Sequence, residues 1–338
     1  MDANKSIKIG VTIIVVFVVG LFLKLAKPVL VPFCMAVLLS LALTPVLDYL
    51  VARKIPKPLA MAGILLLTLI VLFLIGGLFY SSGKSLAAEL PSYNEMMKAA
   101  MEGADQNLPN ARLRAEIVGW ISGLNAEKVG GFILSALGPF VSFVSDLLLV
   151  FVFMIFLLAG RGRMEKKITA AFSPDQAHAL ARTVSKIDRQ VQKYLAVKTL
   201  VCLITGVLTA VVLALFGLPF AIIFGVLTFL LNYIPTLGSI IATVPPVLMS
   251  VFFFGSLGPA LGILGLLTAF NIILGNFVEP RLMGIGLGLS QLLVFFSLFF
   301  GAWLWGIPGM ILAVPILAVL KIVFANVPSL KVLDELMG

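Results

Sequence analysis

The sequence predicts an all-α polytopic membrane protein of about eight transmembrane helices, with broken or re-entrant segments in its C-terminal half and a small polar extracytoplasmic excursion. Of its 338 residues, 61% are hydrophobic and only 12% are charged, whereas a soluble domain carries roughly 25% charged residues. The mean hydropathy is +1.16. From 199 to 320 only Glu279 and Arg281 are charged, so a globule built from this segment would lack the polar surface that water requires. We therefore expect this segment to lie in the lipid bilayer.

Residues 1–83 are predicted to form an N-terminal scaffold of three spans. The spans correspond to uncharged runs at 9–23, 28–47 and 59–83. No small-x-small cleavage pattern follows the first run, and Lys24 and Lys27 come next. We therefore interpret it as a retained helix rather than a signal peptide.

A polar stretch at 84–128 then interrupts the apolar pattern with five basic and six acidic residues. We expect two short helices there, at 91–102 and 111–123, in an excursion too small to be an independent enzyme domain. A fourth span follows within 129–160 and contains Asp146. Because a carboxylate deep in a span needs a partner, Asp146 is a candidate proton relay.

The region 161–198 carries nine basic and three acidic residues. Its S-P-D-Q motif at Ser173 indicates a helix start with Pro174 in the first turn. Apolar residues then recur at spacings of four, three, four and three from Leu180 to Tyr194, which predicts an amphipathic helix with a narrow apolar seam. The seam either lies at the membrane surface or packs against another helix or subunit, and we favour packing.

Loop charge predicts the topology. The loops at 53–57 and 161–198 are basic while 84–128 is net negative, which places the first two in the cytoplasm and the third outside. The N-terminus and the tail at 328–338 are then cytoplasmic.

The segment 199–327 is predicted to be the transport core, because glycine and proline break it into pieces of unequal length. The breaks lie near 217–219, 232–235, 276–288 and 306–308. In lipid, an unpaired backbone group at a break costs several kcal/mol unless protein or water satisfies it. Transporters place their ion and substrate sites at such broken helices, so we expect re-entrant hairpins here, with simple proline kinks as the alternative.

Polar side chains beside these breaks are the candidate site. The substrate- or ion-binding candidates are Asn232, Tyr233, Pro235, Thr236, Ser239, Asn271, Asn276, Glu279 and Arg281. Glu279 is a second candidate proton relay, since burial raises a carboxylate pKa and a neighbouring guanidinium lowers it. The alternatives are purely structural roles: an ion pair between Glu279 and Arg281 that fixes topology, and hydrogen bonds between helices that the other side chains make.

Several classes of protein are disfavoured. No G-x-x-x-x-G-K-[ST] motif indicates ATP use, and no H-E-x-x-H motif indicates a zinc protease. Cys34 and Cys202 lie in apolar segments, and the lone His178 is in a charged loop, so no metal site is expected. The basic residues lie in loops between spans, which indicates topology rather than nucleic-acid binding. We expect a protein that is not an enzyme.

Four ordered motifs resemble the autoinducer-2 exporter (AI-2E) family of bacterial membrane transporters. They are G-L-P-F-A near 217, N-Y-I-P-T-L-G near 232, V-E-P-R-L-M-G-x-x-L-x-L-S-Q-L from 278 and G-I-P-G-M-I-L-A-V-P from 306. The resemblance covers nearly the whole chain. It implies the bacterial cytoplasmic (inner) membrane, a homo-oligomer such as a pentamer, no cofactor, and export of a small solute. Some relatives look like Na⁺/H⁺ antiporters, so coupling to Na⁺ or H⁺ is also implied, whereas Asp146 matches no family motif.

Three hypotheses follow. The first is a secondary transporter that exports a small polar, autoinducer-2-like solute. The second is a monovalent cation/proton antiporter that uses Glu279. The third is a non-transporting envelope scaffold or interaction protein. Flux through purified protein in liposomes distinguishes them.

Overall fold

The structure is a computed structural model that describes residues 3–78, 81, 85, 147–160, 170–171, 173–235, 237–283 and 288–338. These residues form helices and turns and contain no strand. Five of the described helices are long and apolar enough to cross a membrane. Large apolar side chains face outward, for example Phe73 on one of these five helices, Lys57–Leu78, and Phe17 on α1 (Ala3–Leu25), whose apolar part is shorter. An apolar exterior of this kind suits lipid, so the predicted fold class is confirmed.

The chain divides into two compact units, each assembled from separate stretches of sequence. The first contains α1, α2 (Lys27–Ala52), the helical stretch 147–160 and the N-terminal half of α7 (Pro174–Leu215). It also contains α12 (Gln291–Trp305), α13 (Ile307–Asn326), a 3₁₀ turn (Pro328–Leu330) and α14 (Lys331–Leu336). The predicted tail at 328–338 is therefore largely helical.

The first unit has two apolar clusters. One joins α2 to the helices 57–78 and 147–160 through side chains that include Leu47, Ile64 and Met154. The other joins α2 to the α12–α13 hairpin through Val31, Trp305 and Leu312. The indole of Trp305 also donates a hydrogen bond of 2.9 Å to the carbonyl of Leu23, which ties α12 to α1.

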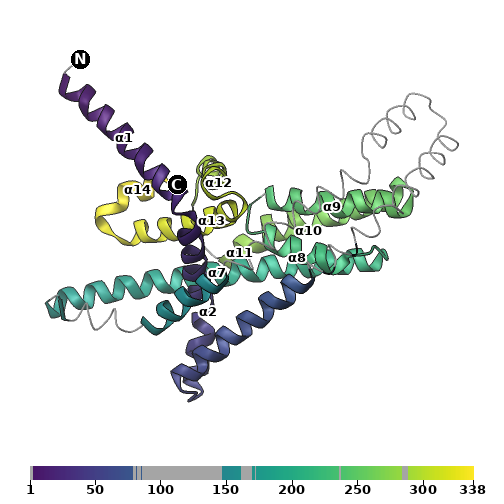
Figure 1. The fold of residues 1–338 in the computed structure, drawn as a ribbon, viewed down its shortest axis with the longest axis horizontal. Helices are drawn as coiled ribbons and strands as arrows, with labels where there is room; N and C mark the ends of the chain where they lie inside the picture. The colour runs from purple at the N-terminus through teal and green to yellow at the C-terminus, as the bar shows by residue number, and fades with distance from the viewer. Residues whose placement is uncertain are drawn as a thin grey trace. The chain divides into compact units, whose positions relative to one another are not determined.

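The second unit contains the C-terminal half of α7, α8 (Ala221–Leu231), α9 (Leu237–Phe254) and α10 (Leu257–Ile273). Helix α9 packs against both α8 and α10 (Figure 1). Leu213, Phe224, Met249 and Ile263 belong to the apolar core that these helices share. With 11 residues, α8 is about 16 Å long, too short to cross a hydrocarbon layer of about 30 Å. This length supports the expected hairpin in the broken region.

Three predicted breaks are turns between helices. Gly217 and Gly306 have φ of 72° and 74°, a left-handed conformation that glycine adopts at little cost, and each opens a G-x-P turn. The third turn, 232–235, separates α8 from α9. The segment that follows leaves no room for a side chain at Gly238, where a Cβ would overlap the carbonyl of Leu231.

Two boundaries differ from the prediction. The amphipathic helix and the span after it form one continuous helix, α7, because nothing between Pro174 and Leu215 breaks the helical hydrogen bonds. The predicted break beginning at Asn276 is a π-helical turn, Leu274–Val278, that joins α10 to α11 (Glu279–Met283). Asp146, Thr236 and both predicted helices of the 84–128 excursion lie outside the described residues.

Candidate functional site

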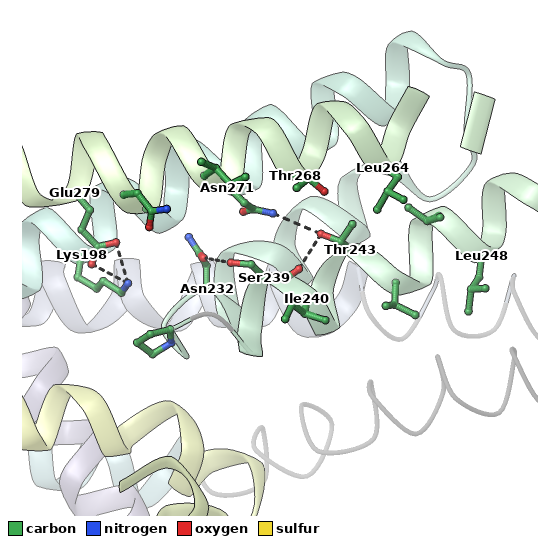
Figure 2. Close-up of a pocket in the computed structure, with 16 residues that line it drawn as sticks. Lys198, Asn232, Ser239, Ile240, Thr243, Leu248, Leu264, Thr268, Asn271 and Glu279 are labelled. Carbon is green, nitrogen blue, oxygen red and sulfur yellow. Dashed lines mark hydrogen bonds and ion pairs between the residues drawn. The ribbon is translucent and has the colours of Figure 1, made fainter. Parts of the chain in front are cut away.

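A cavity of about 640 Å³ lies in the second unit, chiefly between α9 and α10. Its polar lining comes from α7, from the turn after α8, from one face of each of α9 and α10, from the π-helical turn and from the start of α11 (Figure 2). The polar residues that line it are Lys198, Asn232, Ser239, Thr243, Thr268, Asn271, Asn276 and Glu279. Branched aliphatic residues such as Ile240, Val244 and Leu264 complete the wall. The volume falls in the range of roughly 300–1,000 Å³ that is typical of small-molecule sites.

An ion pair occupies one end of this cavity. The ammonium Nζ of Lys198 donates to Oε1 of Glu279 at 2.9 Å and to Oε2 at 3.1 Å. The side chains are only 6% and 18% exposed, so burial leaves each charge with little solvent. Because both carboxylate oxygens bind the same ammonium, the pair brings no net charge to the cavity.

The π-helical turn explains the local geometry around Glu279. Pro280 has no N–H, and in an α-helix its ring would collide with the carbonyl of Asn276, four residues earlier. The wider turn avoids that collision, and the Glu279 amide bonds to the carbonyl of Leu274, five residues back. Such turns occur frequently at functional sites. Here the proline also removes a backbone donor next to the cavity.

A chain of hydrogen bonds links the amides and hydroxyls of α7, the turn and α9. The Nδ2 amide of Asn232 donates to Oγ1 of Thr205 at 3.2 Å, and Ser239 Oγ donates to Oδ1 of Asn232 at 3.1 Å. The hydroxyl of Thr243 donates to the carbonyl of Ser239 at 2.8 Å. Figure 2 shows Asn232, Ser239 and Thr243 of this chain. Both polar ends of the Asn232 amide are therefore used in holding the turn.

Asn271 connects α10 to the same chain. Because the hydrogen of the Thr243 hydroxyl is committed to Ser239, Asn271 must present its NH₂ group to Thr243 Oγ1, a long contact of 3.5 Å. Its Oδ1 is buried and has no hydrogen-bond partner among the described residues. A buried acceptor in this state costs about 1–3 kcal/mol, so rearrangement of α9 against α10 that let a donor reach it would be favourable.

Six of the nine predicted binding residues line the cavity. They are Asn232, Pro235, Ser239, Asn271, Asn276 and Glu279. Tyr233 does not: its hydroxyl shares a 2.7 Å hydrogen bond with Thr199, and its ring meets Phe229 edge-on. Arg281 is exposed and is not part of the cavity wall.

The alternative of an ion pair between Glu279 and Arg281 is wrong, since Lys198 is the partner of the carboxylate. Side chains two residues apart on a helix point to different faces. Sequence reasoning also missed Lys198, Thr243 and Thr268 as lining residues. Thr243 follows Ser239 by four residues and Thr268 precedes Asn271 by three, so helical spacing was the available signal.

No group of three histidine, cysteine, aspartate or glutamate residues in the described ranges is placed to hold a metal ion. The polar groups at hand are amides, hydroxyls, one carboxylate and one ammonium. Such groups bind small polar solutes through hydrogen bonds, or monovalent cations through their oxygens.

Short and interrupted helices around a polar cavity, in a chain with several apolar spans, define a polytopic membrane protein of the transporter class. The chain belongs to the AI-2E transporter family, since the family model described as "AI-2E family transporter" matches residues 11–329. Membrane transport is the function of that family.

Individual relatives align along nearly the whole chain. A Haemophilus influenzae protein named "Putative transport protein" is 31% identical over 332 residues, covering 95% of this chain and 92% of the relative. YhhT of Escherichia coli K12, with the same description, is 30% identical over 297 residues, covering 88% and 84%. The "AI-2 transport protein TqsA" of E. coli K12 is 29% identical over 320 residues, covering 94% and 92%.

Proposed function

We propose that this protein is a secondary transporter of the bacterial inner membrane that exports a small, uncharged polar solute resembling autoinducer-2 through the cavity of the second unit. The main support for this proposal is the set of residues that line the cavity. Asn232, Ser239, Thr243 and Asn271 place amides and hydroxyls in its wall, and the two charged residues in the described part of the lining, Lys198 and Glu279, neutralise each other. This environment suits a solute that forms hydrogen bonds and has no net charge.

The relative TqsA supports the choice of solute, because its name assigns it to autoinducer-2. The aliphatic wall residues around the amides also fit a small organic molecule better than a hydrated ion. Export rather than import, the inner membrane, cytoplasmic termini and a homo-oligomer such as a pentamer are parts of the same proposal. They rest on the basic loops and on the family resemblance.

A monovalent cation/proton antiporter is the second candidate, favoured by the carboxylate of Glu279 at the cavity wall. In this alternative Glu279 exchanges a cation for a proton during the cycle, and coupling to Na⁺ or H⁺ is then obligatory. The pairing of Glu279 with Lys198 weighs against it, because the ammonium already compensates the charge. The third candidate, an envelope scaffold, has no use for a polar cavity.

Efflux from liposomes that contain purified protein tests the proposal. Preloaded autoinducer-2 is expected to leave faster than from empty liposomes, and Asn232→Ala and Asn271→Ala are expected to slow it at least tenfold. Asn326→Ala is the matched control, because Asn326 also makes side-chain hydrogen bonds, to Gln190 and to Ile322, but belongs to the other unit.

Proton-coupled Na⁺ flux without solute flux would support the antiporter instead. Equal loss of solute flux in all three variants would contradict the cavity as the route.

A further inference from the structure

We infer that Lys198 is a built-in counter-cation that sets the charge selectivity of the cavity: it keeps monovalent cations off Glu279, and its removal turns this end of the cavity into a Na⁺ site. The inference rests on the proposed function, since it explains why the same cavity would take an uncharged solute. It also relates the two candidate functions to each other through one residue.

The position of the ammonium carries the argument. Its nitrogen lies 2.9 and 3.1 Å from the two oxygens of Glu279, where a metal cation bound by both oxygens would compete directly with it. The Lys198 side chain is 6% exposed, and the structure shows no other acceptor for its Nζ among the described residues. A cation cannot bind the carboxylate in this way without displacing the lysine.

Two neighbours of Glu279 in the chain also line the cavity and carry oxygens that could bind a cation. Asn276 and Gly275 line the cavity next to Glu279, and Asn276 supplies both a side-chain and a backbone carbonyl. Because Pro280 has no N–H to offer the Asn276 carbonyl, that oxygen lacks its usual helical partner. Carboxylate and carbonyl oxygens are the ligands that hard cations prefer. Without the ammonium, this end of the cavity has a negative charge and the donors to hold Na⁺.

Electrostatics predicts how removal of Lys198 and addition of Na⁺ change the stability of the protein. Removing one partner of a buried ion pair leaves an uncompensated charge, which strongly destabilises the fold. A Na⁺ ion that binds only the folded protein restores stability in proportion to its concentration. Replacing Lys198 by methionine keeps most of the side-chain length and removes the charge. A second change, Glu279→Gln, removes the carboxylate and with it the reason for a cation to bind.

The test is thermal unfolding of the purified full chain in detergent, in NaCl and in choline chloride at equal ionic strength. Lys198→Met is expected to unfold at a higher temperature in Na⁺ than in choline. Wild type and the double variant Lys198→Met/Glu279→Gln are each expected to unfold at the same temperature in both salts. The control is Lys321→Met, which breaks a second lysine–carboxylate pair, with Asp334 at 2.9 Å outside the cavity.

Equal responses of Lys198→Met and the double variant to Na⁺ would overturn the inference, and so would a wild type that responds as strongly. If Lys198→Met cannot be isolated in either salt while the double variant can, no cation replaces the ammonium and the inference also fails. A Na⁺ response shared by Lys321→Met would show a general effect of an unpaired carboxylate, which contradicts a built site. The readout needs no solute, so it remains informative if the efflux experiment fails.

Discussion

Gly206 of α7 and Gly225 of α8 meet backbone to backbone. A Cβ added to either glycine would lie 2.6 Å from the carbonyl oxygen of the other, a distance that real Cβ atoms do not adopt. At this pair the two helices therefore meet through their backbones, as small residues allow in membrane proteins. This crossing precedes the turn that contains Asn232 and fixes where that turn lies relative to α7.

Gly206→Ala is expected to destabilise the protein by about 1–3 kcal/mol, because the added methyl group forces the helices apart. Gly265→Ala in α10 is the matched control, since no atom lies within 4 Å of a Cβ there. The control substitution should stabilise the folded protein slightly, because alanine reduces the backbone freedom of the unfolded chain. Unfolding in detergent measures both, and equal destabilisation of the two variants would show that the crossing is not tightly packed.

Thr243→Val removes the hydroxyl that links the Ser239 carbonyl to Asn271. We expect a loss of about 1 kcal/mol in stability and a rise in the KM for solute, with less effect on the maximal rate, because Asn271 loses its anchor. Thr183→Val is the matched control, since the Thr183 hydroxyl also bonds a carbonyl four residues back, on the half of α7 in the other unit. A comparable rise in KM in the Thr183 variant would refute a specific role for Thr243.

Pro280→Ala restores a backbone donor after the π-helical turn and removes the ring that prevents α-helical geometry. The expected result is a shorter turn, a rotated Glu279 and a weakened ion pair with Lys198. Hydrogen exchange should show slower exchange around 280, and solute efflux should fall severalfold. Pro315→Ala, inside α13 of the other unit, should leave efflux near wild type, and unchanged efflux in the Pro280 variant would argue against a role for the turn.

Loop charge predicts that 84–128 and the start of α7 lie on opposite sides of the membrane. Cysteines placed at Tyr93 and Asp175, in a background without Cys34 and Cys202, should react with an impermeant maleimide from opposite sides. The residue at 93 should be labelled in intact spheroplasts and the residue at 175 only after lysis. Labelling of both in intact spheroplasts would contradict the predicted topology.

Much of the fold could be predicted because its signals are local. Uncharged runs predicted the helices, and G-x-P motifs predicted the turns at Gly217 and Gly306, since a left-handed glycine ends a helix and the proline two residues later cannot extend it. The same local chemistry misled at Pro280. There a π-helical turn accommodates the proline ring without ending the helix, and the helical run continues from Leu257 to Met283.

The site was harder to predict, because its key contact joins distant parts of the chain. Lys198 and Glu279 are 81 residues apart, and no spacing rule connects them, so the nearer Arg281 was the only partner that the sequence suggested, as an alternative. Thr243 and Thr268 gave only a weak signal, since threonines in membrane helices commonly bond their own backbone. Asn232 and Asn271 were found because asparagine is rare in lipid-facing helices and needs partners.

The most direct test of the cavity as the solute path is protection of a cysteine placed inside it. Thr268 is exposed to the cavity, and Thr268→Cys in the background without native cysteines changes little in size. Autoinducer-2 is predicted to slow its modification by a small methanethiosulfonate at least fivefold in the purified transporter. His178→Cys, on the part of α7 that is predicted to lie outside the membrane, should react at one rate with or without solute. Equal modification rates of the Thr268 cysteine at saturating solute would contradict the account.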